Sequence, residues 1–250
     1  MNDAVYQLAS FMIMREPTIW RWSHTRHHTD TIIAGLDPEI VIRPPSFIGI
    51  AADFFAIRTT WRTLGALGLH AFGRLTVEES TFIPEGERGS VFRTARIWLV
   101  LHACIIAAAW MSASWLPLML VGVLPTMYGA WMQVYFGLTQ HAGLAENVLD
   151  HRLNSRTVLM NPAFRFVYWN MNYHIEHHMF PMVPYHALPQ LHRIMLPDTP
   201  KPYAGTLSVY RELIPALWKQ RRDPGFTIDR ALPSTARPYR PDLHGEASLP

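Results

Sequence analysis

A stretch without a single charged residue is the feature that most constrains this chain. No Asp, Glu, Lys or Arg occurs in the 49 residues from 97 to 145. One helix that crosses a bilayer needs about 20 apolar residues, so this stretch has room for two. We therefore predict a hairpin of two spanning helices, over residues 97–115 and 116–138. The alternative is a buried hairpin in a large soluble protein, but soluble cores rarely extend so far without a charge.

Arginines on both sides of this stretch indicate how the hairpin is oriented. Positive residues concentrate on the cytoplasmic side of a membrane, so we expect both ends of the hairpin, and the residues that follow them, in the cytoplasm. The sequence pI is about 9.2, yet no basic stripe with interleaved aromatic residues is present, so nucleic-acid binding is not indicated. The flanking arginines are Arg88, Arg93, Arg96, Arg152, Arg156 and Arg165.

The segments before the hairpin also favour helices, which makes the predicted fold class all-α. Apolar residues recur at helical spacing over residues 1–14, and residues 47–72 resemble a helix lying along the membrane surface. For the second segment, an amphipathic helix packed on a soluble core is the alternative. Arg43, Pro44 and Pro45 predict a loop between the two segments.

Composition changes after Met195, where Pro, Arg and Asp become frequent. We therefore divide the chain into a membrane domain over residues 1–197 and a Pro-rich cytosolic tail over residues 198–250. We expect the tail to be poorly ordered beyond about residue 223. The predicted architecture is a transmembrane hairpin with a cytosolic helical cap, and the cap carries the histidines described next.

Two copies of the pattern HxxHH carry the chemistry of the sequence. On a helix, residues i, i+3 and i+4 fall within an arc of about 100°, so three imidazoles point towards one place. Neutral imidazole binds divalent iron, zinc or copper, and two such clusters imply more than one metal ion. The histidines are His24, His27 and His28 in the first copy, and His174, His177 and His178 in the second.

The predicted topology brings both clusters to one side of the membrane, because the hairpin starts and ends there. His141 lies where the second span ends and is positioned to join them. The single cysteine, Cys104, lies inside the apolar stretch, which excludes an intrachain disulfide and thiolate sites of the CxxC type. Any metal is then held by imidazole or carboxylate.

Two other metal-dependent functions fit the histidines less well. A zinc peptidase needs HExxH, in which a glutamate serves as the general base, and neither cluster has that form. Seven nitrogen ligands also exceed the tetrahedral shell that zinc prefers, so redox-active iron fits better. A metal transporter would place ionisable ligands inside its spans, and His102 is the histidine that lies there.

Four strings give the chain a family resemblance. They are HTRHHTDT from His24, DPE from Asp37, TQHAGL from Thr139, and NMNYHIEHHMFPMVPYHALPQLH from Asn170. Over residues 1–197 the sequence resembles the membrane fatty acid desaturase and hydroxylase superfamily, and within it the bacterial branch that is similar to rhizopine oxygenases. The family's HxxxH-type first box should precede His24, and nothing before His24 supplies it. We therefore expect the membrane domain to be N-terminally incomplete.

The resemblance implies a cofactor, an electron donor and a location. It implies two iron ions held by the histidines of the boxes, with O₂ as co-substrate, and a ferredoxin-type donor with its reductase. It also implies a multi-pass protein in a lipid bilayer, which in bacteria is the inner membrane. We expect no catalytic residue beyond the metal ligands. The expected ligands are His24, His27, His28, His141, His174, His177 and His178.

Four polar residues near the boxes are candidates for supporting the ligands. Such a residue accepts the remaining ring N–H of a ligating histidine and thereby fixes its tautomer. For each of these residues, a position in a solvated loop or a role as a helix cap is an equal alternative. The candidates are Asp30, Asp37, Asn172 and Glu176.

The expected activity is O₂-dependent desaturation or hydroxylation of an unactivated C–H bond in a fatty acyl or hydrocarbon chain. The boxes do not distinguish the two outcomes, because both use the same ligands. One alternative substrate is a rhizopine-like methylated inositol amine. The other alternative is an inactive, truncated membrane protein that lacks the first box.

Overall fold

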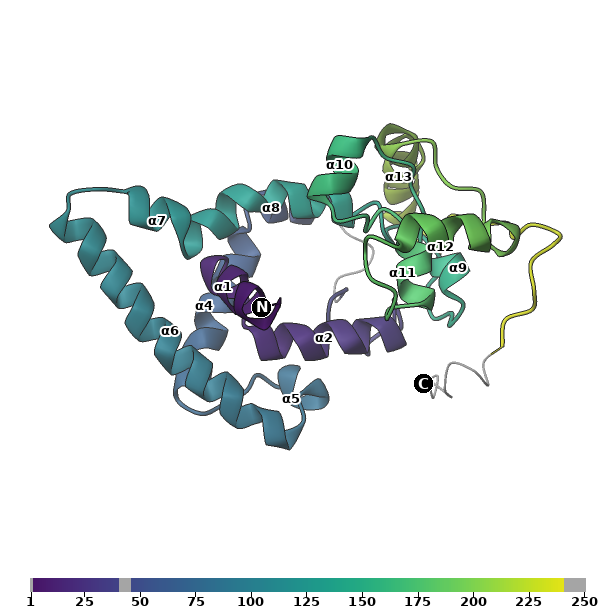
Figure 1. Ribbon diagram of the computed structural model, residues 1–250. Coiled ribbons are helices and arrows are strands. Elements are labelled where there is room, and N and C mark those ends of the chain that lie inside the picture. The colour runs from purple at the N-terminus through teal and green to yellow at the C-terminus, as the bar shows by residue number, and fades with distance from the viewer. Residues whose placement is uncertain (1, 41–45, 241–250) are drawn as a thin grey trace. The chain divides into compact units, whose positions relative to one another are not determined.

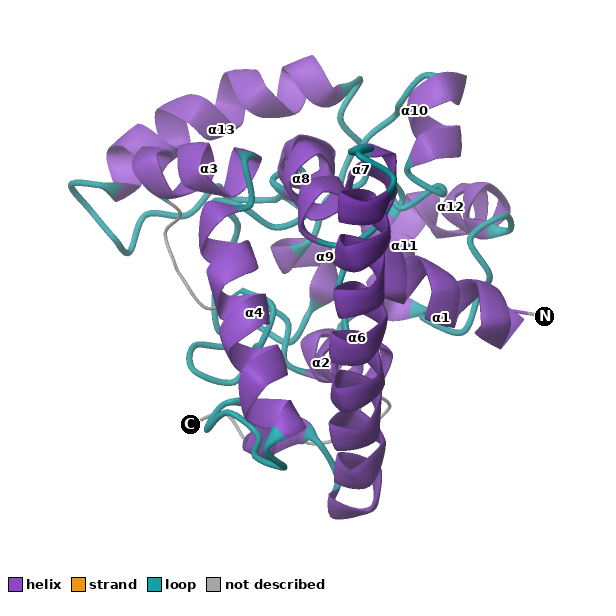
Figure 2. Ribbon diagram, turned by 90° about the vertical axis from the view of Figure 1, so that its left-hand side faces the viewer, coloured by secondary structure: helices purple, strands orange, loops and turns teal. Residues whose placement is uncertain are grey.

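The computed structural model describes residues 2–40 and 46–240, and over these it is helical. Figure 2 shows helices and loops without a strand among the described residues, which contain two isolated bridges, Thr157 with Tyr173 and Val158 with Tyr203. The all-α prediction is confirmed for this part of the chain. In order, the α-helices are α1 (Asn2–Met12), α2 (Pro17–Thr29), α3 (Phe47–Phe54), α4 (Ile57–Ala71), α5 (Glu79–Phe82), α6 (Glu85–Met111), α7 (Leu116–Leu120), α8 (Val123–Gly137), α9 (His151–Asn154), α10 (Pro162–Val167), α11 (His174–Met179), α12 (Leu188–Met195) and α13 (Thr206–Gln220), and the 3₁₀ helix η1 (Leu196–Asp198) follows α12.

Contacts within the chain define two compact units. Unit 1 comprises residues 1–25 and 47–134, and unit 2 comprises residues 26–46 and 135–250. This division differs from the predicted boundary at residue 197, because His27 and His28 of the first HxxHH pattern belong with the C-terminal half, whereas His24 falls in unit 1. Two of the boundaries fall inside helices, one within α2 and one within α8.

Unit 1 is organised around α6, and α4 runs alongside it (Figures 1 and 2). Their shared core contains Leu67 from α4, Ala95 and Trp98 from α6, and Met14. Most of the remaining surface of α6 is exposed, including Ile97, Val100, Ile106 and Trp110. An apolar helix with so little of its surface covered by protein is typical of a segment in contact with lipid.

Helix α6 is the one helix in the described residues that is long and apolar enough to cross a membrane. It has 27 residues, and about 17% of its most apolar window is buried. It begins at Glu85, twelve residues before the span expected at residue 97. The first arm of the predicted hairpin therefore lies within a longer helix.

The second arm of the predicted hairpin is not a continuous helix. Helix α7 ends at Leu120 and α8 begins at Val123. At the break, Gly122 adopts a positive φ of 96° and its N–H donates to the carbonyl of Met12 at 2.8 Å. Helix α8 has 15 residues, about 22 Å of helix, which falls short of a hydrocarbon core of about 30 Å. The two-span hairpin is therefore not confirmed.

The segment over residues 47–72 also contains a break. Helix α3 ends at Phe54, and Ala56, in the left-handed region with φ 49°, precedes α4. Its large exposed apolar side chains include Phe55 and Trp61, and its placement on a membrane surface stays a prediction. The predicted loop at Arg43, Pro44 and Pro45 lies outside the described residues.

Unit 2 holds four short helices, α9 to α12, joined by loops (Figure 1). The predicted Pro-rich tail contributes structure to this unit. Helix α13 buries Leu213 and Ala216, and Ile228 packs in the same cluster as Leu144 and Ala216. The Ile228 N–H donates to the carbonyl of Gly143 at 2.7 Å, so the chain beyond residue 223 is anchored beside the turn that carries His141.

Candidate metal centre

Three segments bring histidines together inside unit 2. The last turn of α2 carries His27 and His28. His141 follows α8 in a turn that is closed by the Leu144 N–H to the His141 carbonyl at 3.1 Å. Helix α11 carries His174 and His178 one turn apart, so both side chains lie on one face.

Four of these histidines form a buried group with converging ring nitrogens. The group comprises His27, His141, His174 and His178, and one ligand atom from each lies within 4.8 Å of the others. His174 Nε2 lies 2.8 Å from His141 Nε2 and 3.0 Å from His178 Nε2. Each of the four residues is at most 4% exposed, so water does not surround these rings.

Hydrogen bonds on the outer side of the rings fix their tautomers. His141 Nδ1 donates to the carbonyl of Asn154 at 2.8 Å, and His27 Nδ1 donates to the Asp37 carboxylate at 2.9 Å. The hydroxyl of Thr31 donates to the His27 carbonyl, so at 3.1 Å it accepts from His178 Nδ1. In the neutral rings of His27, His141 and His178, the proton is therefore on Nδ1 and the lone pair is on Nε2.

Lone pairs that face one another across such short distances need a cation between them. A neutral His174 can carry at most one proton on Nε2, and that proton can form a hydrogen bond with only one of the two neighbouring atoms, His141 Nε2 or His178 Nε2. His174 Nδ1 has no hydrogen-bond partner in the described part of the chain. A divalent metal ion satisfies all the converging nitrogens together, because each neutral imidazole donates one lone pair. The donor set thus fits a metal ion that is bound by imidazole.

Burial keeps most of this group neutral. It holds the pKa of His141, His174 and His178 well below the usual histidine value, and the neighbouring imidazoles act in the same direction. Burial also lowers the pKa of His27, but the hydrogen bond and charge of Asp37 outweigh it, so the pKa is raised. A more basic imidazole is a stronger ligand, and Asp37 therefore supports His27 in binding a metal.

A second pair of histidines lies next to the buried four. His28 Nε2 lies 3.1 Å from His177 Nε2, and the His28 ring lies 4.3 Å from the His178 ring between centroids. His24 precedes His28 by four residues on α2, so the two side chains share one face of that helix. This pair offers nitrogen ligands to a second metal ion.

The four predicted supporting residues have different partners. Asp37 is buried and accepts from His27, which is the arrangement expected for it. Asp30 instead forms an ion pair with Arg26. Asn172 donates to the carbonyl of Val158 at 2.7 Å.

Glu176 is fully buried but faces away from the converging nitrogens. It accepts from Thr157 at 2.6 Å and from His192 Nδ1. The helical spacing explains this difference, because Glu176 lies between His174 and His177 and projects from the other side of α11. It therefore anchors the helix that carries the ligands and does not touch a ligand ring.

Sequence reasoning missed four residues around the site. Asn154 and Ser155 contact His141 Nδ1, the latter at 3.3 Å, and Thr31 contacts His178. The His151 ring lies 5.2 Å from the His178 ring. Thr31, one turn beyond His27, was detectable from spacing. Asn154 was not, because it contributes a backbone carbonyl, which any residue offers.

Histidines outside the boxes have structural contacts. His70 Nε2 pairs with Glu79 at 2.8 Å, and His102 Nδ1 donates to the Trp98 carbonyl at 2.7 Å. His186 is exposed, and its ring packs against Tyr185. None of these contacts involves a histidine of the two boxes or His141, so they support the fold without joining the metal centre.

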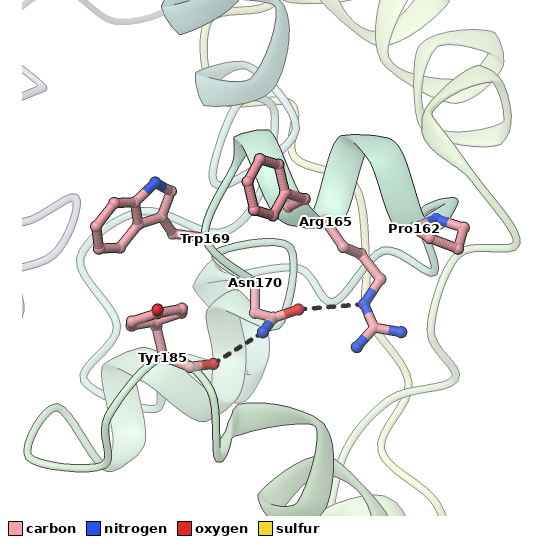
Figure 3. A pocket seen from close by; sticks show the side chains of 6 residues that line it. Pro162, Arg165, Trp169, Asn170 and Tyr185 are labelled. Atoms are coloured by element: carbon pink, nitrogen blue, oxygen red, sulfur yellow. Dashed lines mark hydrogen bonds between the residues drawn. The ribbon is translucent and has the colours of Figure 1, made fainter.

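A surface pocket of about 360 Å³ lies just before the second box (Figure 3). Trp169 and Tyr185 form one wall, and their ring centroids are 4.8 Å apart. Asn170 accepts from Arg165 Nε and donates to the Tyr185 carbonyl. Trp169 and Asn170 both have positive φ, 52° and 55°, so this turn is strained where it leads into α11.

Comparison with known proteins identifies the family. Residues 1–210 of the 250 match the family described as Fatty acid desaturase. Comparisons with curated proteins and with solved structures gave no match. The family match covers both histidine boxes and His141, and it confirms the resemblance drawn from the four sequence strings at the level of the superfamily. The chain belongs to the fatty acid desaturase family.

Proposed function

We propose that this protein uses two iron ions and O₂ to desaturate or hydroxylate an unactivated C–H bond of a fatty acyl or hydrocarbon chain. One observation carries the proposal. In a chain of the fatty acid desaturase family, the Nε2 atoms of His141, His174 and His178 converge within 3.0 Å of their neighbours.

The histidines divide naturally between two ions. His27, His141, His174 and His178 would hold one iron, and His24, His28 and His177 would hold the other. Bound iron supplies the one-electron chemistry and the O₂ reactivity that protein side chains lack. The ligand sets contain imidazole alone, which suits a metal that changes its oxidation state better than a closed tetrahedral zinc site.

The protein residues hold the ligands in place and keep water away. Asp37, Thr31 and Asn154 fix the tautomers of three ligand rings, so their lone pairs point inward before any metal arrives. The residues of the buried four are each at most 4% exposed, which limits access of bulk water. Preorganised ligands of this kind reduce the cost of reorganisation when the metal binds.

Electrons come from outside the chain in this proposal. A ferredoxin-type protein, with its reductase, would supply them. The substrate would reach the site from lipid, for which the family and the exposed apolar surface of α6 are the support. We further propose a multi-pass protein of the bacterial inner membrane with its histidines on the cytoplasmic side, on the basis of the flanking arginines.

Metal analysis and product analysis test the proposal in two steps. Purified full-length protein should contain about two iron ions per chain, as expected for two ligand groups. With ferredoxin, reductase and a long-chain acyl substrate, mass spectrometry should detect a loss of two hydrogens or a gain of one oxygen. Stoichiometric zinc would contradict the proposal. Turnover of a methylated inositol amine would favour the rhizopine-like alternative, and iron without any turnover would favour the inactive one.

A further inference from the structure

Arg156 is a buried cation without a hydrogen-bonded counter-ion. Its side chain is among the largest fully buried ones, with 1% of the residue exposed. Among the described residues its Nε, Nη1 and Nη2 atoms make no well-aligned hydrogen bond, and the Tyr203 side chain lies near enough to act as a partial acceptor that raises the pKa of Arg156. A guanidinium carries five N–H donors and stays protonated in proteins, so one partial acceptor leaves most of its donors unsatisfied, which is unfavourable inside a protein. Such a group indicates that an acceptor occupies the site in the working protein.

A second arginine faces the same tyrosine. The Arg156 guanidinium carbon lies 5.7 Å from the centroid of the Tyr203 ring, and that of Arg230 lies 4.4 Å from it. Arg230 donates through Nη2 to the Lys201 carbonyl at 2.7 Å. Its Nε is buried and, within the described residues, has no hydrogen-bond partner. Two guanidinium groups with open donors thus border one aromatic ring.

The nearby acid does not neutralise this pair. Glu212 accepts from the Tyr203 hydroxyl, and its side chain is exposed to solvent, where water screens its charge. Burial lowers the pKa of Arg156 and outweighs the charge and side-chain hydrogen bond of Tyr203 and the charge of Glu212, which raise it, while the charge of Arg230 also lowers it. A region with two arginines and one exposed carboxylate has an excess of positive charge that a further anion would balance.

We propose that Arg156 and Arg230 bind one small oxyanion, a carboxylate or a phosphate group, beside the ring of Tyr203. The planar fork of a guanidinium matches the two oxygens of such an anion. The backbone holds the site in place, because Tyr203 N–H donates to the Thr157 carbonyl at 3.0 Å and Leu159 N–H donates to the Tyr203 carbonyl at 2.8 Å.

The proposed anion site is joined to the metal centre through the chain. Asn154 and Ser155, which directly precede Arg156, contact the ring of His141. Thr157, which follows it, donates to Glu176 on α11. An anion on Arg156 would therefore stabilise the segment that positions ligands from two elements. The anion would be a structural ligand that stabilises unit 2, and it would lie apart from the C–H bond that reacts.

Thermal unfolding of the purified full-length protein tests this site without any assay of turnover. At constant ionic strength, held with sodium chloride, either sodium phosphate or sodium acetate should raise the unfolding temperature to a plateau. In Arg156→Gln the half-saturating concentration should rise about ten-fold or more, as expected when charge-assisted hydrogen bonds are lost. Arg156→Lys, which keeps the charge without the fork, should lose less. Arg222→Gln, an exposed arginine of the same unit, should behave as wild type.

The salt that raises the unfolding temperature identifies the chemical class of the bound anion. A plateau with phosphate alone indicates a phosphoryl ligand, and one with acetate indicates a carboxylate. Displacement of acetate by a long-chain fatty acid would assign that carboxylate to a lipid. Should Arg156→Gln fail to fold, the partly exposed Arg230→Gln tests the same site. The proposal is overturned if wild type shows no plateau with either anion, or if the arginine variants respond as wild type does.

Discussion

The position of one proton on each ring decides whether a histidine here can bind metal. Asp37, Thr31 and Asn154 each engage Nδ1 of a different ligand ring, which puts the lone pair of the neutral ring on Nε2. A side chain carries out this role in two cases and a backbone carbonyl in the third. At this scale the site is a set of oriented lone pairs, and the ligands and their supports can be tested separately.

Removing one ligand should remove one metal ion. We expect His178→Ala to lower the iron content from about two ions per chain to about one, because its ring belongs to the buried group alone. Elemental analysis of the purified protein measures this. His186→Ala is the matched control, since His186 is exposed and packs against Tyr185. Unchanged iron in His178→Ala would contradict the assignment.

Changing a supporting residue should lower the affinity for the metal without abolishing metal binding. Asp37→Asn replaces the acceptor for His27 Nδ1 by an amide, and we expect metal affinity to fall by about 10–100-fold. Competition with a chelator measures the affinity. Asp37 also accepts from the backbone N–H groups of Ile32, Glu39 and Ile40, so the unfolding temperature is measured in parallel.

A second variant, Asp30→Asn, tests whether the loss in Asp37→Asn comes from the lost contact with a ligand ring or from the loss of any nearby negative charge. Asp30→Asn removes a carboxylate that pairs with Arg26 and contacts no ligand ring through a described hydrogen bond. Asp30 is itself buried, with 4% of the residue exposed, so it matches Asp37 in burial. The metal affinity of Asp30→Asn should stay within about two-fold of wild type, because the large losses come from residues that orient a ligand ring. Equal losses in the two variants would argue against a specific role for Asp37.

Among the elements, α6 carries the evidence for a membrane span. Its length and its exposed apolar surface fit a bilayer, whereas α8 is too short and α7 is a fragment. The break at Gly122 follows from its positive φ and its hydrogen bond to Met12. A hydropathy pattern reports only how long a segment stays apolar, so it does not reveal where the backbone turns within it.

A charge in the middle of α6 distinguishes contact with lipid from contact with water. Ile106 is 59% exposed, so Ile106→Arg removes little packing and would be tolerated in water. In a bilayer it should cost about 2.5–3.5 kcal/mol and reduce the fraction of protein that resists carbonate extraction from membranes. Ile106→Leu should partition as wild type does. Identical partitioning of the arginine variant would count against a span at α6.

For the whole molecule, the division into two units predicts an uneven response to loss of metal. Unit 2 contains the buried four histidines, whereas the α4–α6 core belongs to unit 1. A ligand that binds only the folded state stabilises that state, and the effect on local opening is largest where the ligand binds.

Anaerobic removal of the metal should therefore loosen unit 2 first. We expect faster backbone hydrogen exchange in α11 and in residues 154–157, with little change in the segments of α4 and α6 that form their shared core. Mass spectrometry of peptides before and after chelation measures this, and adding back ferrous iron should restore protection. Uniformly faster exchange across both units would show that the metal stabilises the fold as a whole.

The sequence by itself determined the helical class, the family and the histidine boxes, because these depend on local spacing and on residue type. A spacing of three and four residues places imidazoles on one face of a helix wherever that helix lies. The tertiary structure decided which histidines meet, which nitrogens carry protons, and where the apolar stretch bends. Those properties depend on contacts between segments far apart in the chain, such as Asn154 with His141 and Gly122 with Met12. No local pattern encodes a backbone carbonyl as a partner, so the residues that orient the ligands appear only once the chain is folded.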